Sequence, residues 1–400
     1  LFGLQLNDWE GSVKRRDFIK TSMAAAAFTA ASQGNIFSAM AAPKLKVGVM
    51  IPLSGPAALF GPSTKNVAQM AAEKINSGGG ILGRKIEILF GDAGLPPAEA
   101  AQTALRMWRG QGCEAFVGMH NSAVRGAYNN VFKGQVPYVY TPNYEGGECA
   151  NGVYYVGETP AQSVVPTMKW LAGEKKLKKF YLIGNDYNWP RDTNVIAKKT
   201  ISELGGKVVG EEYMPFTVDN FDSSLAKIKE TGADMVLITL VGGASVTFNR
   251  AFASFGLSDK VIRLGTLIDE NTLLGIGAEN SKNIYSAASY FANVQTNEAK
   301  AFAKEYAKKF GSKAPVLNAL SGSAYDGLIA LDTIAERAGS LSTKKMDSVA
   351  EGSEWDSPRG RAKMSNRHLT LDIYLATAIG TNFKIVKTFS RQDPGNFCKA

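Results

Sequence analysis

The sequence predicts an α/β fold of two doubly wound lobes, joined by a hinge that the chain crosses several times. Three observations support this prediction. Residues 115–146 read as a strand, a helix and a second strand, with a polar loop after each strand. The alternation of strands and helices starts again near residue 158. The last third of the chain adds elements that fit both lobes, which implies several crossings and a hinged cleft.

Length and composition describe a globular chain with more than one core. Four hundred residues exceed one ordinary hydrophobic core. Apolar residues make up 45% of the chain and charged residues 20%, which excludes a disordered protein. The formal net charge is +9, but Lys and Arg occur only in short clusters such as Lys175-Lys176. We interpret these clusters as solvated surface and expect no nucleic-acid partner.

Residues 1–41 are expected to hold an upstream extension and a twin-arginine signal peptide. Arg15-Arg16 precedes an apolar residue and a lysine, an alanine-rich segment follows, and Ala-Met-Ala at 39–41 fits a cleavage site. We expect Val13 to be the true initiator. The apolar segment is too short to span a bilayer, so we expect a periplasmic mature chain without membrane insertion. The alternative is an N-terminal helix of the mature fold.

The three cysteines match no metal-binding spacing. Export would place them in an oxidising compartment. Cys113 precedes an apolar strand, so we expect a small, buried core residue. Cys149 and Cys398 lie in polar, loop-like sequence and are the expected pair if a disulfide forms. His120 and His368 are the only histidines, so we expect no multi-histidine metal site, and no cofactor.

The first lobe is expected to start with a strand over residues 45–51, where apolar residues alternate. Small residues and Pro fill the following loop, and Ser63 is a candidate helix cap. The triple glycine at 78–80 follows a helix and not a strand, so we interpret it as a turn and not as a phosphate-binding loop. The next expected elements are a strand over 85–90, a helix over 97–109, a strand over 115–119, a helix after Ser122 and a strand over 136–141.

The second lobe repeats this pattern. The expected strands cover 179–184, 207–213, 234–240 and 261–266, and the helices between them end near 204, 231 and 255. Beyond them we expect a strand over 283–290, helices over 298–310 and 324–338, and a strand pair over 369–390 that turns at Gly380. The expected boundaries are 42–157 with 286–345 for the first lobe, and 158–285 with 346–400 for the second.

Polar side chains follow the strands of the first lobe at two places. His120, Asn121 and Ser122 end one strand and start a helix, whose free N–H groups favour a carboxylate or carbonyl oxygen. Ser122 can equally be a plain helix cap. Tyr140 and Thr141 end the next strand, and a tyrosine there suits a small amphipathic ligand or packs as a strand-end aromatic.

Tyr187 and Trp189 follow the equivalent strand of the second lobe. Two positions apart in an extended loop, their rings would face the same way and form an aromatic wall toward the first lobe. The alternative is a surface aromatic pair. His120 and Ser122 also raise the possibility of a hydrolase, but no acid is placed to orient the histidine, and there is no G-x-S-x-G motif. We therefore expect no enzyme.

Several motifs together carry a family resemblance over essentially the whole mature chain. Val47-Gly48-Val49 with Pro52-Leu53-Ser54-Gly55-Pro56 and Ile81-Leu82-Gly83-Arg84 resembles the opening of the type I solute-binding proteins of ABC importers, which include the branched-chain amino-acid binders. Tyr144-Glu145-Gly146, Asp186-Tyr187-x-Trp189-Pro190-Arg191 and Val241-Gly242 are most similar to the amide- and urea-binding branch. The resemblance implies ligand contacts at His120, Ser122, Tyr140, Pro142, Tyr187 and Trp189, and near Thr266.

The resulting hypothesis is a periplasmic receptor that captures a small amide, urea-like compound or amino acid by closing its cleft, and delivers it to the membrane subunits of an ABC permease. The sequence departs from the branch at three points: His120 replaces an aromatic residue, Thr141-Pro142 alters the usual order, and Trp189 replaces a smaller ring. The alternative function is a ligand sensor of the same fold that regulates a partner protein without transport.

Overall fold

The structure is a computed structural model that describes residues 42–395. The expected signal peptide and Cys398 lie outside these residues. Within them, no helix is both long and apolar enough to cross a membrane. Cys113 is buried and has a free thiol, as expected. Cys149 is disulfide-bonded, but its pairing with Cys398 remains a prediction.

The first lobe contains five parallel strands in the order β2-β1-β3-β4-β5. The strands are β1 (Leu45–Ile51), β2 (Ile86–Asp92), β3 (Ala115–Gly118), β4 (Tyr138–Tyr140) and β5 (Val153–Tyr155). The helical segments between them are η1 (Ala58–Phe60), α1 (Gly61–Ser77), α2 (Pro97–Leu105), the π-helical η2 (Arg106–Gly110) and α3 (Ser122–Phe132). β3 and β4 are buried along their whole length, because helices cover both faces of a parallel sheet.

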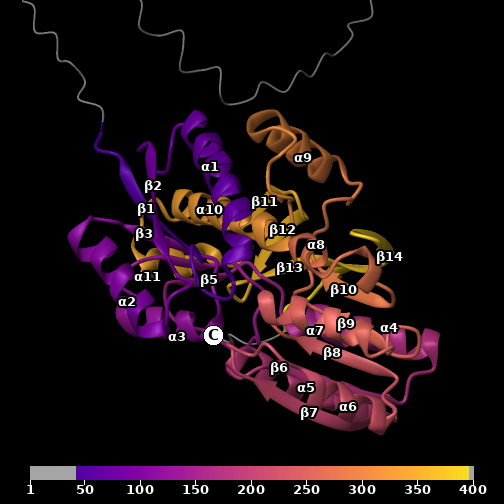
Figure 1. The fold of residues 1–400 in the computed structure, drawn as a ribbon. Helices are drawn as coiled ribbons and strands as arrows, with labels where there is room; N and C mark the ends of the chain where they lie inside the picture. Colours follow the sequence, from indigo (N-terminus) through magenta and orange to yellow (C-terminus); the bar gives the residue numbers. More distant parts are fainter. Residues whose placement is uncertain (1–41, 396–400) are drawn as a thin grey trace, which may run out of the picture. The chain divides into compact units, whose positions relative to one another are not determined.

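The second lobe repeats the arrangement with parallel strands in the order β7-β6-β8-β9-β10. The strands are β6 (Lys179–Asn185), β7 (Lys207–Met214), β8 (Met235–Thr239), β9 (Ile262–Gly265) and β10 (Ile284–Ala288). The helical segments are α4 (Pro160–Lys175), α5 (Asn188–Glu203), α6 (Asp222–Thr231), α7 (Gly243–Ser254), α8 (Glu270–Ile276) and η3 (Ala278–Asn280). Figure 1 shows these elements in magenta to orange, grouped around their own strands.

The rest of the chain joins the two lobes. It comprises α9 (Asn297–Phe310), α10 (Ala319–Ala338), α11 (Thr343–Ala350), β11 (Glu354–Ser357), β12 (Gly360–Ser365), β13 (His368–Ile379) and β14 (Asn382–Gln392). The start of β13 pairs with β12 and, at His368, with β5 of the first lobe. Its later part pairs with β10 of the second lobe and with β14. One long strand therefore belongs to both sheets, and the two-lobed α/β class expected from the sequence is confirmed.

The strand pairing changes one expected lobe boundary. β11 and β12 pair with the first-lobe end of β13, and α11 packs on α10, which itself contacts α1, β3 and β4. Residues 343–365 therefore lie with first-lobe elements and not, as expected from residue 346 onward, with the second. β10 pairs with β9, so residues 286–288 lie in the second-lobe sheet. The other boundaries remain a prediction.

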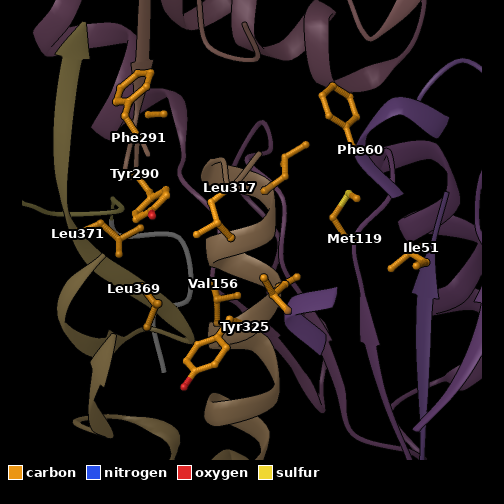
Figure 2. Close-up of a cluster of buried hydrophobic side chains, with 14 of the residues drawn as sticks. Ile51, Phe60, Met119, Val156, Tyr290, Phe291, Leu317, Tyr325, Leu369 and Leu371 are labelled. Carbon is orange, nitrogen blue, oxygen red and sulfur yellow. The ribbon is translucent and has the colours of Figure 1, made fainter. Parts of the chain in front are cut away.

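Segments far apart in the sequence share one hydrophobic core. Figure 2 shows Ile51 and Met119 from the N-terminal part in the same cluster as Leu317, Leu369 and Leu371. Figure 1 likewise places the late helix α10 among the early strands and helices. The core that includes first-lobe residues is thus built from both ends of the described chain.

One expected loop is wrong. Tyr187 and Trp189 were expected in one extended loop, but α5 already begins at Asn188, with Tyr187 as its N-cap residue. Trp189 therefore sits in the first helical turn, where only 3% of it is exposed. Pro190 accounts for the early start, since proline fits the first turn of a helix, where its missing N–H has no partner to lose.

Candidate functional site

A cavity lies where the strands of both lobes end. Its lining residues follow the carboxyl ends of β1, β3, β4, β6, β8 and β9, or belong to the start of α10. They are Ala57, Phe60, Met119, His120, Asn121, Ser122, Tyr140, Pro142, Asn143, Tyr187, Trp189, Val241, Leu267 and Leu320. The space between these atoms, with the part open to solvent included, is about 390 Å³. We call this space the first cavity.

The lobes meet closely around the first cavity. Gly242 has φ +56°, and a Cβ added to it would lie 2.0 Å from the carbonyl oxygen of Pro56 in the first lobe. Only glycine tolerates both the positive φ and this approach. The Val241-Gly242 turn, which the sequence singled out, is therefore a point of direct contact between the lobes.

Most of the residues expected at a ligand site line this cavity. They are His120, Asn121, Ser122, Tyr140, Pro142, Tyr187 and Trp189. Thr141 does not: it is fully buried, and its hydroxyl donates to the carbonyl of Gly118 over 3.2 Å. Thr266 lines an adjoining space instead. Whether the seven contact a ligand remains a prediction.

His120 is neutral, and both of its ring nitrogens are hydrogen-bonded to neighbouring groups. Its Nδ1 lies 3.1 Å from the carbonyl oxygen of Asn121, and this oxygen can only accept, so Nδ1 carries the proton. Nε2 then accepts from the Tyr138 hydroxyl at 2.8 Å. Burial lowers the pKa of His120 to about 3. The imidazole makes no bond to Ser122 among the described contacts, so the pair lacks the geometry of a nucleophile and its base.

Ser122 is not the cap of α3. The side chain of Asn121 accepts from the backbone N–H of Val124 at 2.9 Å and so occupies the cap position. The Ser122 hydroxyl is thereby available for other partners. It donates to Glu145 Oε2 at 2.7 Å and accepts from Arg125 Nη1 at 2.9 Å.

A buried ion pair supports this wall of the cavity. Arg125 is fully buried and contacts Glu145 at 2.5 Å and the more exposed Glu148 at 3.2 Å. Its guanidinium also lies over the rings of Tyr140 and Tyr144, at 4.8 and 4.7 Å from their centroids. Nearby carboxylates and rings hold the pKa of Arg125 well above its usual value despite the opposing effect of burial. One guanidinium is thus already paired with two acidic side chains behind the wall.

The second lobe contributes aromatic rings. The centroids of Tyr187 and Trp189 are 6.2 Å apart, and Phe216 packs on Tyr187 at 5.0 Å. The rings lie together although Trp189 is helical, because the helix N-cap stays extended and turns the two side chains toward one cavity. The alternative of an exposed aromatic pair is excluded for Trp189 by its burial.

Sequence reasoning missed both apolar and charged parts of the site. Phe60, Leu267 and Leu320 line the cavity but come from the short helix η1, the bend after β9 and a distant helix start, which no local pattern brings together. The partnership of Arg125 and Glu145 was also missed. The spacing of three residues between Ser122 and Arg125 is a usable signal, because it places both on one helix face.

The comparisons with known proteins agree with this architecture. A family model described as periplasmic binding protein matches residues 44–382. The chain belongs to the periplasmic binding protein family. It is 29% identical over 377 residues to the Leu/Ile/Val-binding protein homolog 6 of Brucella melitensis, covering 90% of this chain and 95% of that protein.

The fold of this periplasmic binding protein is similar to those of solved solute-binding proteins. A solute-binding protein of an ABC transporter from Rhodopseudomonas palustris, in complex with p-hydroxybenzoic acid, is 27% identical with a TM-score of 0.80, covering 88% of this chain and 98% of that one. A leucine-binding protein from Thermotoga maritima has a TM-score of 0.78 at 18% identity, covering 86% and 99% of the two chains, and shows the fold alone. The type I fold and the role of a small-ligand binder of ABC transporters, the class that works with membrane permeases, follow.

Proposed function

We propose that this protein is the solute receptor of an ABC importer, and that the part of its solute held in the first cavity is a neutral group with N–H donors, of the amide or urea type. The solute would be enclosed in the first cavity as the lobes close and then passed to the permease. Contacts made to both lobes only in the closed state would shift the population toward closure. No catalytic step is part of the proposal.

The main support for this ligand class is that the hydroxyl protons of Ser122 and Tyr140 are already donated to other groups of the protein. The Ser122 hydroxyl donates to Glu145. The Tyr140 hydroxyl donates to the carbonyl of His120 at 2.8 Å, and burial raises the pKa of Tyr140 to about 12, which keeps that proton in place. Neither oxygen therefore has a proton left for the cavity, and each can still accept a hydrogen bond, Ser122 Oγ through the one lone pair that Arg125 does not use. A carboxamide or urea NH2 can donate to them, and a carboxylate cannot.

Charge supports the same class. None of the lining residues of the first cavity is an Asp, Glu, Lys or Arg. Arg125, behind the wall of this cavity, is already paired with Glu145 and Glu148. A buried carboxylate ligand would lack a free counter-ion there, and the cost of burying an unpaired charge is high. The N-terminal N–H groups of α3 can still hold the carbonyl oxygen of a neutral amide.

The names of the relatives mention other solutes, so a test of the proposal has to compare these solutes with amides. Some are named for leucine, isoleucine and valine, and the Rhodopseudomonas structure holds an aromatic acid. Isothermal calorimetry should compare acids and amides of the same skeleton: acetate with acetamide, and benzoate with benzamide, together with urea, 4-hydroxybenzoate and leucine. We expect each amide to bind at least tenfold more tightly than its acid. Tighter binding of the acids or of leucine would overturn the proposed ligand class.

An uptake assay in cells distinguishes the transport function from the alternative, a ligand sensor. If the protein is the receptor of an importer, deleting its gene should abolish uptake of the labelled solute at low concentration. A sensor would leave uptake intact when the importer genes are expressed from a constitutive promoter.

A further inference from the structure

A second cavity adjoins the first near the hinge. The two share Asn143, Leu267 and Leu320 as lining residues. The second is also lined by Thr266 and Ile268 after β9, by the start of α8, and by Ser286, Ala288 and Tyr290 in and after β10. It therefore lies between the ligand site and the strands through which the second lobe joins β13.

Three residues that line the second cavity each have a buried polar atom with no hydrogen-bond partner. These atoms are Thr266 Oγ1, Asp269 Oδ2 and the Tyr290 hydroxyl. These residues are only 7%, 5% and 1% exposed. The other oxygen of Asp269 accepts from the N–H of Thr272 at 2.8 Å and caps α8, which fixes the carboxylate in place. Buried polar groups are almost always paired in folded proteins, so a missing partner is expected here.

The charges around the second cavity specify what that partner is. Two carboxylates line it, those of Asp269 and Glu158, and no Lys or Arg is among its lining residues. Glu158 Oε1 already accepts from the N–H of Ser289. Arg359, which also contacts Ser289, is held by Asp326 at 2.6 Å. Asp269 Oδ2 can only accept, and the hydroxyls of Thr266 and Tyr290 can accept as well as donate, so a hydrogen-bond donor or a positive charge can be bound by all three.

A metal ion does not fit this site as well as a single donor group does. Among residues 42–395, no group of three or more His, Cys, Asp or Glu side chains is arranged to hold a metal. Asp269 supplies one oxygen, and the other two free acceptors are neutral hydroxyls. An ammonium or hydroxyl group needs only two or three such acceptors.

We propose that the second cavity is a subsite for a donor group of the solute, an ammonium or a hydroxyl, accepted by Asp269, Thr266 and Tyr290. The solute would then have two ends, with an amide in the first cavity and the donor group beyond Leu267 and Leu320. This inference rests on the proposed function, since it assumes that the first cavity holds the amide.

The test compares solutes that differ only in the distal group. Calorimetry at pH 7 would pair glycinamide with propanamide, 3-aminopropanamide with butanamide, 4-aminobutanamide with pentanamide, and 4-hydroxybenzamide with benzamide. We expect at least one donor-bearing amide to bind tenfold or more tightly than its partner. In Asp269→Asn, which keeps a good helix cap, that ratio should fall below about threefold. Tyr290→Phe, which keeps the ring, should also lower it. Asp259→Asn, an exposed residue paired with Lys282, is the control and should keep the full ratio.

The possible failures are distinguishable. If simple amides bind but no donor-bearing amide gains affinity, or the gain survives in Asp269→Asn and Tyr290→Phe, the subsite is refuted, the second cavity holds only water, and the proposed function stands. If no amide binds while acids do, the proposed function fails and the subsite fails with it.

Discussion

The side-chain amide of Asn188 donates a hydrogen bond of 2.8 Å to Glu145 Oε1 and so connects the two lobes. Glu145 also accepts from Ser122 and Arg125, so one carboxylate joins the wall of the first cavity to the first turn of α5. A second contact runs from Asn143 Nδ2 to the carbonyl of Thr266 at 3.4 Å. In the closed arrangement Glu145 is held from both lobes.

Asn188→Ala should weaken solute binding by roughly tenfold, because it removes a charge-assisted hydrogen bond worth about 1.5 kcal/mol that forms only on closure. The loss should appear mainly as faster dissociation in stopped-flow measurements. Arg191→Ala is a matched control: it lies on the same helix, but its ion pair is with Asp186 of its own lobe. An unchanged affinity in Asn188→Ala would show that Glu145 does not couple closure to binding.

Ser122→Ala and Trp189→Phe separate the polar wall from the aromatic wall. Ser122→Ala removes one acceptor and should cost about 0.5 to 1.5 kcal/mol of binding free energy. Trp189→Phe should cost more, about 2 kcal/mol, because a large ring at the centre of an interface acts as a hot spot. Calorimetry on both variants makes the comparison, and equal losses would refute this ranking.

Trp189→Ala should also destabilise the fold, which the same change in an exposed loop would not do. The side chain is buried in the main hydrophobic cluster, and such truncations cost about 3 to 5 kcal/mol of unfolding free energy. Melting curves without solute test this. An unchanged melting temperature would mean that the helical turn repacks around the missing ring.

Glu270 should make the protein less stable as the pH rises. Burial, followed by the charge of Asp269, raises the pKa of Glu270 to about 8, against an unfolded value near 4.5. The folded state therefore keeps a proton that the unfolded state loses, and stability falls between pH 4.5 and 8. Glu270→Gln should remove this loss and be more stable than the wild type by more than about 1 kcal/mol at pH 8.5, with little difference at pH 4. Parallel denaturation profiles from pH 4 to 9 would contradict the prediction.

Thiol counting tests the disulfide. We expect one free thiol, that of the buried Cys113, before reduction and three afterwards. A bridge from Cys149 to Cys398 closes a loop of well over 100 residues, for which the chain-entropy model gives about 5 kcal/mol. Intact-mass analysis of the alkylated, denatured protein gives the count, and three free thiols before reduction would refute the pairing.

Export by the twin-arginine route is also proposed. Replacing Arg15 and Arg16 with Lys should trap the precursor in the cytoplasm. Immunoblots of periplasmic and cytoplasmic fractions measure this. Normal periplasmic recovery of the double variant would show that another export route suffices.

The sequence by itself determined the order of most strands and helices. Leu45, Val47 and Val49 alternate, and the buried runs of β3 and β6 end in polar residues, because such patterns are set by neighbours in the chain. The rule that ligands bind at the carboxyl ends of parallel strands then located seven residues of the first cavity. The short strand β5 and the largely polar strands β11 and β12 carry no such pattern and were missed.

Only the tertiary structure decided which long-range partners meet. β13 joins both sheets, and residues more than 200 positions apart pair along it. Arg125 and Glu145 form their buried ion pair because folding removes both from water at the same point. The same packing fixes the protons of Ser122 and Tyr140, and so sets whether the cavity offers donors or acceptors. Hydrogen-bond polarity in a closed cavity depends on the partners of each hydroxyl, and these partners come from separate segments of the chain.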